Sequence, residues 1–503
     1  MSEREKIFPR LEEQFLAAWR GREKEKCVWW RGEWWSWERL NNLALDCEAV
    51  LRLSGFGEGQ RLAVMLPNSP MVFALSIACW RLRGAVAPLN ARAGFISAKG
   101  VLELLDVNAV LLAEDVYEKY TQQGLKSEYP VVSCKMEEPP SPWPGRKGSP
   151  ESADVAVIFA TSGTTGAPKA VTCLHSNISS NITSIIPHVP KLLVKGTVFL
   201  NVLPNFHTLG YNTAGILPMM SGVAQAVVPS FVPVDNTIQA IKDAGVNVIV
   251  AVPTVMAFLL GTLSRKDDYL KGIRHVIVGG DKLNTALEER CLKHTGVGIM
   301  EGYGLTECCP VISVQHDAET KKLGTVGTAF AEYEIQVRGR EGNVLDLHEE
   351  GVLWVKGPSV VPGYFRDEAA TKERFSDGWL NTGDVVRIDD DGYITIVDRV
   401  SDIIIVSGFN VYPQEVEAVL REHPAVHSPV VVGEKNIIAG ELVKAFVILE
   451  DGASVTDREL IEFCRERLAR YKVPRKIGFV KEFPVSPTGK ILRRELRDQK
   501  VGK

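Results

Sequence analysis

Short apolar runs alternate with segments of helical character along the first half of the chain. Residues 61–66 and 85–89 are apolar runs of strand length, and the segment 71–83 between them has the character of a helix. Residues 102–105 and 110–113 continue the alternation. Repeated strand–helix units favour a parallel sheet covered by helices on both faces. The pattern therefore predicts an α/β fold.

A cluster of tryptophans lies near the beginning of the chain. Five of the ten tryptophans fall between Trp29 and Trp37, around the turn-forming sequence Arg31-Gly32-Glu33. This pattern predicts a β-hairpin, with Ser36 capping the helix that follows. A membrane-interface belt is the alternative, but no basic amphipathic stretch accompanies the aromatic residues.

The uncharged segment 245–263 is long enough to resemble a membrane span. Pro253 divides it into a β-branched run, Val246–Val252, and a helix-like run, Thr254–Leu263. A buried strand followed by a helix is therefore the favoured interpretation.

The last hundred residues have a different pattern, that of a compact αβ module. Pro413 is placed for the first turn of one helix, and Thr456 with Glu459 forms a capping box for another. A proline-rich connector spans residues 138–150, and a second boundary lies near residues 398–402. We therefore expect one domain over residues 1–398 and a second over residues 399–503.

Composition limits the classes of protein to consider. The chain has 503 residues, of which 45% are hydrophobic and 24% charged, as in a soluble globular protein of more than one domain. Its 62 acidic and 58 basic residues leave a net charge of −4, which argues against nucleic acid as the main partner. Basic residues gather in the tail, where residues 465–503 hold 13 Lys or Arg and 4 Asp or Glu.

The cysteines and the first residues of the chain indicate the cellular compartment of the protein. The nine cysteines are scattered without C-x-x-C spacing, which argues against a disulfide framework or a zinc site and favours a reducing compartment. The first residues contain no apolar core of a signal peptide. We therefore expect a cytoplasmic protein.

The strongest chemical signal is the sequence VAVIFATSGTTGAPK over Val155–Lys169. An apolar strand enters a loop of small and hydroxyl residues, whose backbone N–H groups, hydroxyls and final lysine suit a polyphosphate. The predicted binding residues are Thr161, Ser162, Gly163, Thr164, Thr165, Gly166 and Lys169. The loop does not fit a P-loop, because Pro168 stands where that motif needs glycine and Ala170 where it needs a hydroxyl. A flexible turn is the alternative.

A second signal is the sequence EGYGLTE over residues 301–307. Tyr303 offers an aromatic face for a base, Thr306 a donor for a phosphate and Glu307 a carboxylate for Mg²⁺. A tight turn with a surface acid is the alternative. The following cysteines, Cys308 and Cys309, are interpreted as small wall residues rather than catalytic thiols.

Further candidates are weaker when taken alone. Gly279 and Gly280 would let a flat ring or an acyl chain approach the backbone. The two oxygens of Asp384 suit a vicinal diol, although a turn cap is the preferred interpretation of this residue by itself. A salt bridge is the plain interpretation of Arg399, and a buried core side chain that of His207.

These segments resemble, in order, the motifs of the adenylate-forming superfamily, which includes acyl-CoA synthetases, firefly luciferase and adenylation domains. The matching segments are Thr161–Lys169, Pro204–Gly210, Val278–Leu283, Glu301–Pro310, Trp379–Asp384, Asp398–Asp402, Ser407–Pro413 and Pro487–Lys490. The resemblance implies a large N-terminal domain of layered β-sheets with helices and a small mobile αβ C-terminal domain.

The resemblance also implies a role for each candidate. Tyr303 would stack on adenine, Thr306 would contact the α-phosphate, and Glu307 would hold Mg²⁺. The segment with Gly280 and Asp281 would line the adenine edge and the acyl pocket.

Other roles follow from the later motifs. Asp384 would accept the ribose hydroxyls, joined by Arg399, and His207 would lie beside the substrate carboxylate. Lys490 would bridge that carboxylate and the α-phosphate. Gly408 would line the pantetheine path after the small domain turns about Ser401, a position where many relatives carry Asp or Lys.

The implied activity is that of an acid–CoA ligase, which uses ATP and Mg²⁺ to form an acyl-AMP and then an acyl-CoA. The expected pocket walls, Pro204–Tyr211, Pro253–Phe258 and Cys309–Val314, are mostly apolar, which favours an apolar acid such as a fatty acid. Two alternatives stay open, a separate acyl carrier protein as acceptor and a nucleotide-binding relative without turnover. The sequence is also compatible with a homo-oligomer.

The substitution Lys490→Ala tests the two-step scheme. We expect it to abolish formation of acyl-AMP, because the α-phosphate of ATP loses its cation during adenylyl transfer, and to leave thioester formation from supplied acyl-AMP largely intact. Each half-reaction is measured through its own product. Equal loss of both would contradict the prediction that the small domain alternates between two positions.

Overall fold

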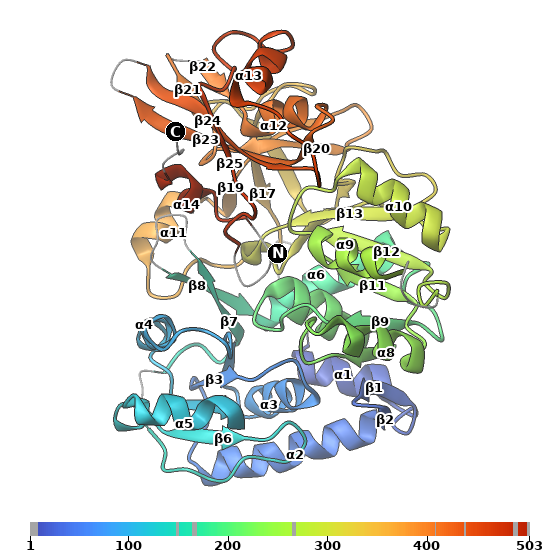
Figure 1. Ribbon diagram of the computed structural model, residues 1–503. Helices are drawn as coiled ribbons and strands as arrows, with labels where there is room; N and C mark the ends of the chain where they lie inside the picture. Colours follow the sequence, from blue (N-terminus) through green and yellow to red (C-terminus); the bar gives the residue numbers. More distant parts are fainter. Residues whose placement is uncertain are drawn as a thin grey trace. The chain divides into compact units, whose positions relative to one another are not determined.

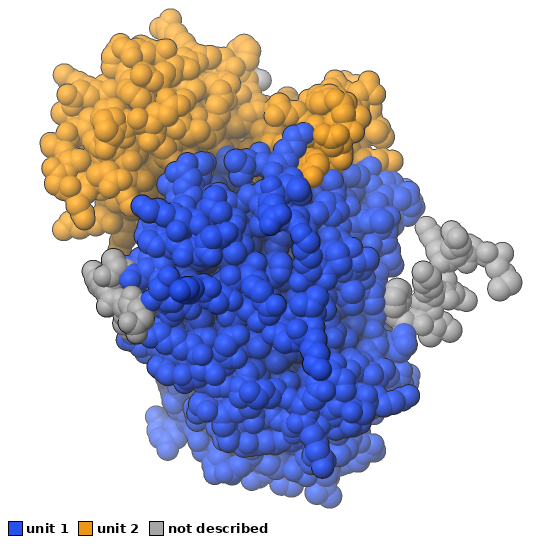
Figure 2. All heavy atoms as spheres, turned by 90° about the vertical axis from the view of Figure 1, so that its right-hand side faces the viewer, with its two compact units in different colours: residues 1–335, 355–380 blue, residues 336–354, 381–503 orange. Residues whose placement is uncertain are grey.

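The computed structural model describes residues 9–146, 150–162, 168–263, 268–407, 409–436, 439–485 and 491–499. The chain divides into two compact units, the first made of residues 1–335 and 355–380 and the second of residues 336–354 and 381–503 (Figure 2). The predicted boundary at residues 398/399 falls inside the second unit. That the C-terminal segment turns about a pivot near this boundary stays a prediction.

The first unit contains a six-stranded sheet with the order β6-β5-β3-β4-β7-β8 (Figure 1). All neighbours are parallel except the last pair, β7 and β8. The strands are β3 (Arg61–Met65), β4 (Ala85–Pro88), β5 (Ala109–Ala113), β6 (Val131–Cys134), β7 (Val155–Ser162) and β8 (Pro168–Leu174). Helices α3 (Pro70–Arg81), α4 (Phe95–Leu105) and α5 (Glu114–Gln122) connect them, which confirms the predicted alternation.

The first unit also contains a nine-stranded sheet with the order β15-β14-β13-β12-β11-β9-β10-β1-β2. Its six central strands are parallel, and the antiparallel pairs lie at the two edges. The strands are β1 (Lys26–Trp30), β2 (Glu33–Ser36), β9 (Val198–Asn201), β10 (Ala224–Val227), β11 (Val248–Ala251), β12 (His275–Gly279), β13 (Ile299–Gly304), β14 (Val311–Val314) and β15 (Thr328–Ala329).

The first unit contains further helices. They are α1 (Leu11–Trp19), α2 (Trp37–Leu53), α6 (His175–His188), α7 (Leu217–Met220), α8 (Val234–Ala244), α9 (Pro253–Thr262), α10 (Thr285–Thr295) and α11 (Glu368–Arg374), with a π-helix at Leu209–Ile216 and a 3₁₀ turn at Thr306–Cys308. Residues 70–80 of α3 are all buried, because this helix is apolar on all sides.

Two local predictions from the sequence are confirmed. The tryptophan cluster forms the β1–β2 hairpin, and the Ser36 hydroxyl accepts a hydrogen bond from the Arg39 N–H at the start of α2. The uncharged segment 245–263 divides at Pro253 into β11 and α9. Among the described residues, no helix is both long and apolar enough to cross a bilayer.

The second unit is built mainly around a sheet with the order β22-β21-β24-β23, in which β25 pairs with β24. Its elements are β21 (Ile404–Val406), β22 (Phe409–Val411), α12 (Pro413–Arg421), β23 (Val426–Asn436), β24 (Gly440–Leu449), α13 (Asp457–Arg465), β25 (Lys476–Phe479) and α14 (Arg493–Asp498). Pro413 begins α12, and Thr456 and Glu459 form the predicted capping box of α13.

A further five-stranded sheet has the order β16-β17-β19-β18, and β20 pairs with β19. Its strands are β16 (Glu334–Arg338), β17 (Gly351–Lys356), β18 (Phe375–Ser376), β19 (Trp379–Ile388) and β20 (Ile394–Arg399). The β19–β20 hairpin places Asp384 directly opposite Arg399.

His175 is a buried histidine that joins α1 to the rest of the first unit. Its Nδ1 accepts a hydrogen bond from the Leu11 N–H at 3.2 Å, and its ring lies edge-on to Trp80. Burial holds the pKa of His175 far below its usual value, with smaller contributions from Arg10 and Arg83. The side chain is therefore neutral in the folded protein at neutral pH.

The substitution His175→Asn should weaken the pH dependence of stability. In the wild type, the unfolded histidine takes up a proton below about pH 6.5 and the folded one does not, so stability falls by about 1.4 kcal/mol per pH unit. We expect the stability advantage of the wild type over the variant to shrink between pH 7.5 and 5, as measured by urea unfolding. A constant difference would contradict a neutral His175.

Candidate active site

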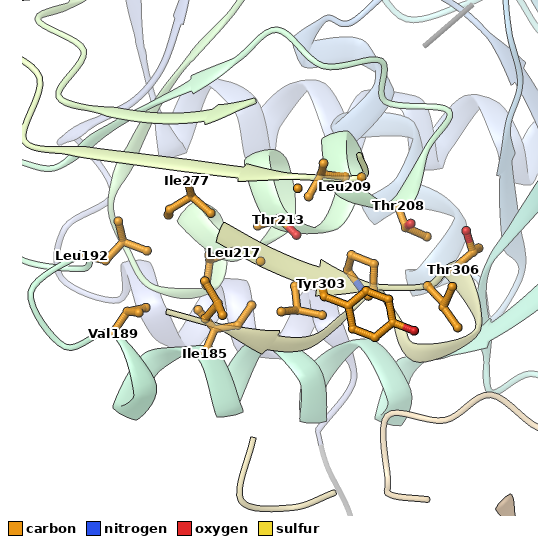
Figure 3. Close-up of a pocket in the computed structure, with 18 of the residues that line it drawn as sticks. Ile185, Val189, Leu192, Thr208, Leu209, Thr213, Leu217, Ile277, Tyr303 and Thr306 are labelled. Carbon is orange, nitrogen blue, oxygen red and sulfur yellow. The ribbon is translucent and has the colours of Figure 1, made fainter. Parts of the chain in front are cut away.

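An apolar cavity of about 170 Å³ lies in the first unit beside the ends of β12 and β13. Ile185, Val189 and Leu192, from the end of α6 and the residues after it, line one end (Figure 3). Tyr303 and Thr306 lie toward the other end. The cavity therefore has an apolar end and an end that bears an aromatic ring and a hydroxyl.

The turn between β13 and β14 is fixed by its backbone. The Leu305 N–H donates to the Pro310 carbonyl at 2.8 Å. A Cβ at Gly304 would lie 1.8 Å from that same carbonyl oxygen, so this position accepts only glycine. The backbone of the turn therefore fixes the positions from which Tyr303 and Thr306 line the cavity.

The cysteines of this turn agree with their predicted structural role. Cys308 and Cys309 are fully buried, and burial raises the pKa of both thiols far above its usual value. A thiol held protonated is a poor nucleophile.

Glu307, the predicted magnesium ligand, is held through both its backbone and its side chain. Its carbonyl accepts a hydrogen bond from the Val361 N–H at 2.9 Å, and its Oε1 accepts one from the Tyr364 hydroxyl at 2.6 Å. Burial, and then the neighbouring Glu307 carboxylate, raises the pKa of Tyr364, so the phenol keeps its proton. The Nζ of Lys169 lies 5.0 Å from the centre of the same tyrosine ring.

The predicted phosphate loop connects two antiparallel strands. Thr161 pairs with Lys169 and Ser162 with Pro168, and the Thr161 hydroxyl donates to the Lys169 carbonyl at 3.2 Å. Strand β8 follows the loop where a P-loop would have a helix, which agrees with the sequence argument against that motif. Residues Gly163, Thr164, Thr165 and Gly166 lie outside the described residues.

The predicted adenine-edge segment is only partly at the cavity. Gly280 lines it with a φ of 84°, a conformation that favours glycine. The Asp281 side chain is exposed and accepts a hydrogen bond from the Lys282 N–H at 2.8 Å. Burial raises the pKa of the nearby Glu301 carboxyl to about 7, a feature that the sequence motif did not reveal.

His207 lies one residue before Thr208, which lines the cavity. Burial lowers the pKa of His207 to about 4, so the imidazole is neutral at neutral pH. A neutral imidazole can donate a hydrogen bond to a carboxyl group, or accept one from it, without carrying a charge.

In the second unit, the structure joins two predicted residues. The Arg399 Nε lies 3.0 Å from the Asp384 Oδ1, and the Asp384 side chain is almost fully buried. The expected pivot residue Ser401 offers its carbonyl to Arg497 at 3.4 Å. Gly408 and Lys490 lie outside the described residues.

Some residues around the site were missed by sequence reasoning. The expected walls Pro204–Tyr211 and Cys309–Val314 contribute to the cavity, whereas none of residues 253–258 lines it. The apolar end comes instead from α6 and the residues that follow, which carried only the ordinary signal of a helix with apolar positions. Tyr364 was missed because it lies in none of the quoted motifs.

Comparison with known proteins supplies the family. The sequence matches the family described as AMP-binding enzyme over residues 15–365, and the family described as AMP-binding enzyme C-terminal domain over residues 415–490. The chain belongs to the AMP-binding enzyme family, as the ordered motifs predicted.

Two curated relatives are named long-chain-fatty-acid–CoA ligases. The one from Bacillus subtilis strain 168 is 31% identical over 498 residues, which cover 91% of this chain and 89% of the relative. The one from Yersinia pestis is 35% identical over 351 residues, or 70% of this chain. That match spans only 62% of the Yersinia protein.

A solved structure shares the fold over nearly the whole chain. It is O-succinylbenzoate coenzyme A synthetase (MenE) from Bacillus subtilis in complex with ATP and magnesium ion. It is 27% identical, with a TM-score of 0.83 over 96% of this chain and 99% of that one. The layered α/β fold is thus confirmed.

The substitution Gly304→Ala tests the rigidity of the turn. The added methyl group would overlap the Pro310 carbonyl, so we expect a loss of stability of about 1–3 kcal/mol or more and a loss of nucleotide binding. Gly100→Ala is the matched control, because nothing lies within 4 Å of a Cβ at that position of α4. The stability of the two variants is compared by thermal unfolding, and their ATP affinity by titration. Equal stability and equal affinity would contradict the close contact between Gly304 and the Pro310 carbonyl.

Proposed function

We propose that the protein is an AMP-forming acid–CoA ligase for an apolar carboxylic acid. The observation that carries this proposal is the cavity, whose far end is lined by Ile185, Val189 and Leu192 and whose near end bears Tyr303 and Thr306. An apolar chain would fill the far end, and its carboxylate would lie at the end beside the motif for AMP.

In this proposal, ATP is a substrate whose parts are bound by separate groups. Tyr303 provides a flat face for adenine, and Thr306 provides a donor for the α-phosphate. The Asp384 carboxylate, oriented by Arg399, would accept the ribose hydroxyls.

The chemistry needs a change of leaving group. A carboxylate is anionic at neutral pH and resists attack by a thiol. Attack of the carboxylate on the α-phosphate of ATP would displace pyrophosphate and form the mixed anhydride acyl-AMP, from which the thiol then displaces AMP. His207, neutral because of its burial, would contact the acid without adding charge. Lys169 and Lys490 would supply positive charge to the phosphates during the transfer.

The residues present fit a magnesium ion that is shared with the nucleotide. Among the described residues, no group of three or more His, Cys, Asp or Glu side chains could enclose a metal. Mg²⁺ in nucleotide sites needs only one or two carboxylates, because phosphate oxygens and water complete its shell. Glu307 would hold the ion, which neutralises phosphate charge when bound.

The proposed acid is a fatty acid, transferred to CoA. The apolar lining of the cavity supports it, and so do the names of the two bacterial relatives. The MenE structure carries the name of a different acid on the same fold, so the choice of a fatty acid rests on the lining of the cavity and on the two relatives.

Release of pyrophosphate across a series of straight-chain acids, with CoA supplied, tests the proposal. Each methylene buried in an apolar site contributes about 0.8 kcal/mol, so kcat/KM should rise about fourfold per methylene until the cavity is filled. Absence of acid-dependent pyrophosphate would overturn the proposed activity, and preference for a short polar acid would overturn the fatty-acid assignment.

The substitution Val189→Phe should shift the preferred acid toward shorter chains, because the ring would occupy the apolar end of the cavity. Val194→Phe is the matched control, since Val194 is exposed and does not line the cavity. The chain-length profile of kcat/KM is the measurement. An unchanged optimum in the Val189 variant would show that the acid binds elsewhere.

A further inference from the structure

Tyr364 is a buried tyrosine that contacts two of the predicted ATP-site residues at once. Its hydroxyl donates to the Glu307 Oε1 at 2.6 Å, and its ring lies 5.0 Å from the Lys169 Nζ. The side chain is 8% exposed. None of the motifs that pointed to the nucleotide site includes this residue.

The position of Tyr364 is fixed from several sides. Its N–H donates to the Thr371 hydroxyl at 3.0 Å, and its ring packs edge-on against Phe375. It also forms an isolated β-bridge with Val171, and the next residue donates its N–H to the Ala170 carbonyl at 2.7 Å. The tyrosine is therefore joined directly to strand β8, which begins at the end of the predicted phosphate loop.

We propose that Tyr364 is a positioning residue for ATP and Mg²⁺, an inference that rests on the proposed function. Its hydroxyl donates to one oxygen of Glu307 and restrains the rotamer of the carboxylate, which would then hold a metal ion in a constant orientation. Its ring holds the Lys169 ammonium by a cation–π contact near the phosphate loop.

The two contacts predict two separable effects. Removing the hydroxyl alone leaves the ring under Lys169 but frees Glu307 to rotate, so it should weaken the part of ATP affinity that depends on the metal. Removing the ring as well should also weaken ATP binding in the absence of metal, because the lysine loses its support.

The first variant is Tyr364→Phe, with Tyr120→Phe as the matched control. Tyr120 is also buried, and its hydroxyl also donates at 2.6 Å, to the Ala93 carbonyl. ATP binding is measured by calorimetry with Mg²⁺ and with EDTA, and the ratio of the two affinities gives the metal-dependent gain. A hydrogen bond to a charged group changes an equilibrium constant by about a factor of ten or more.

We therefore expect Tyr364→Phe to reduce the metal-dependent gain about tenfold and to raise the half-saturating Mg²⁺ of pyrophosphate release by a similar factor. The KM for the acid should stay within about twofold of the wild type, and Tyr120→Phe should change none of these quantities. A metal-dependent gain in the Tyr364 variant within twofold of the control would overturn the role of the hydroxyl.

The second comparison uses Tyr364→Leu and the background variant Glu307→Ala. Tyr364→Leu should lower ATP affinity in EDTA, whereas Tyr364→Phe should not. In the Glu307→Ala background, Tyr364→Phe should have no further effect on the metal-dependent gain. An effect of equal size in both backgrounds would mean that the tyrosine acts through general stability.

These binding measurements are independent of turnover. If the wild type releases no pyrophosphate with any acid, the proposed ligase activity fails, yet the titrations of ATP with and without Mg²⁺ still test the tyrosine. If the wild type is active and the titrations of Tyr364→Phe match those of the control, the inference about Tyr364 fails alone.

Discussion

The arrangement of the site depends on how closely the chain folds back on itself between β13 and β14. The Pro310 carbonyl lies so close to Gly304 that a side chain is excluded there, and it also accepts the Leu305 N–H. A loop with this geometry has few alternative conformations. Tyr303, Thr306 and Glu307 are consequently presented together, and a ligand would not have to bear the entropy of ordering them.

This turn is supported by polar side chains buried beneath it. Asn181 accepts the Val311 N–H at 3.2 Å and donates to the Val311 carbonyl at 2.6 Å. Asn212, in the π-helix, donates to the Cys309 carbonyl at 3.2 Å. Buried polar groups of this kind favour one conformation over its competitors, because any other would leave them without partners.

Much of the fold could be predicted because its signals are local. The strands β3 and β4, the β1–β2 hairpin and the caps of α2 and α13 follow from runs of a few residues. The strand order of the two large sheets could not be predicted in the same way, because it depends on contacts between distant segments. The division of the chain into units also depends on such contacts.

The residues of the site also fall into two groups, those that local motifs predicted and those that they did not. Tyr303, Thr306 and Gly280 line the cavity and were identified from their motifs, and Asp384 and Arg399 meet as an ion pair. Ile185 and Val189 were missed, because an apolar residue in a helix looks the same whether it faces a core or a ligand. Tyr364 was missed because only its contact with Glu307, a residue 57 positions away in the sequence, links it to the predicted site.

The two units are joined by several covalent connections, and these bear on how the units can move. The backbone passes from one unit to the other at three places, after residues 335, 354 and 380. Any change in the relation between the two units therefore has to be accommodated at three covalent connections at once. The segment that follows β20 is attached at its beginning by a single peptide connection, so a wide rotation of this segment alone would strain no second tether.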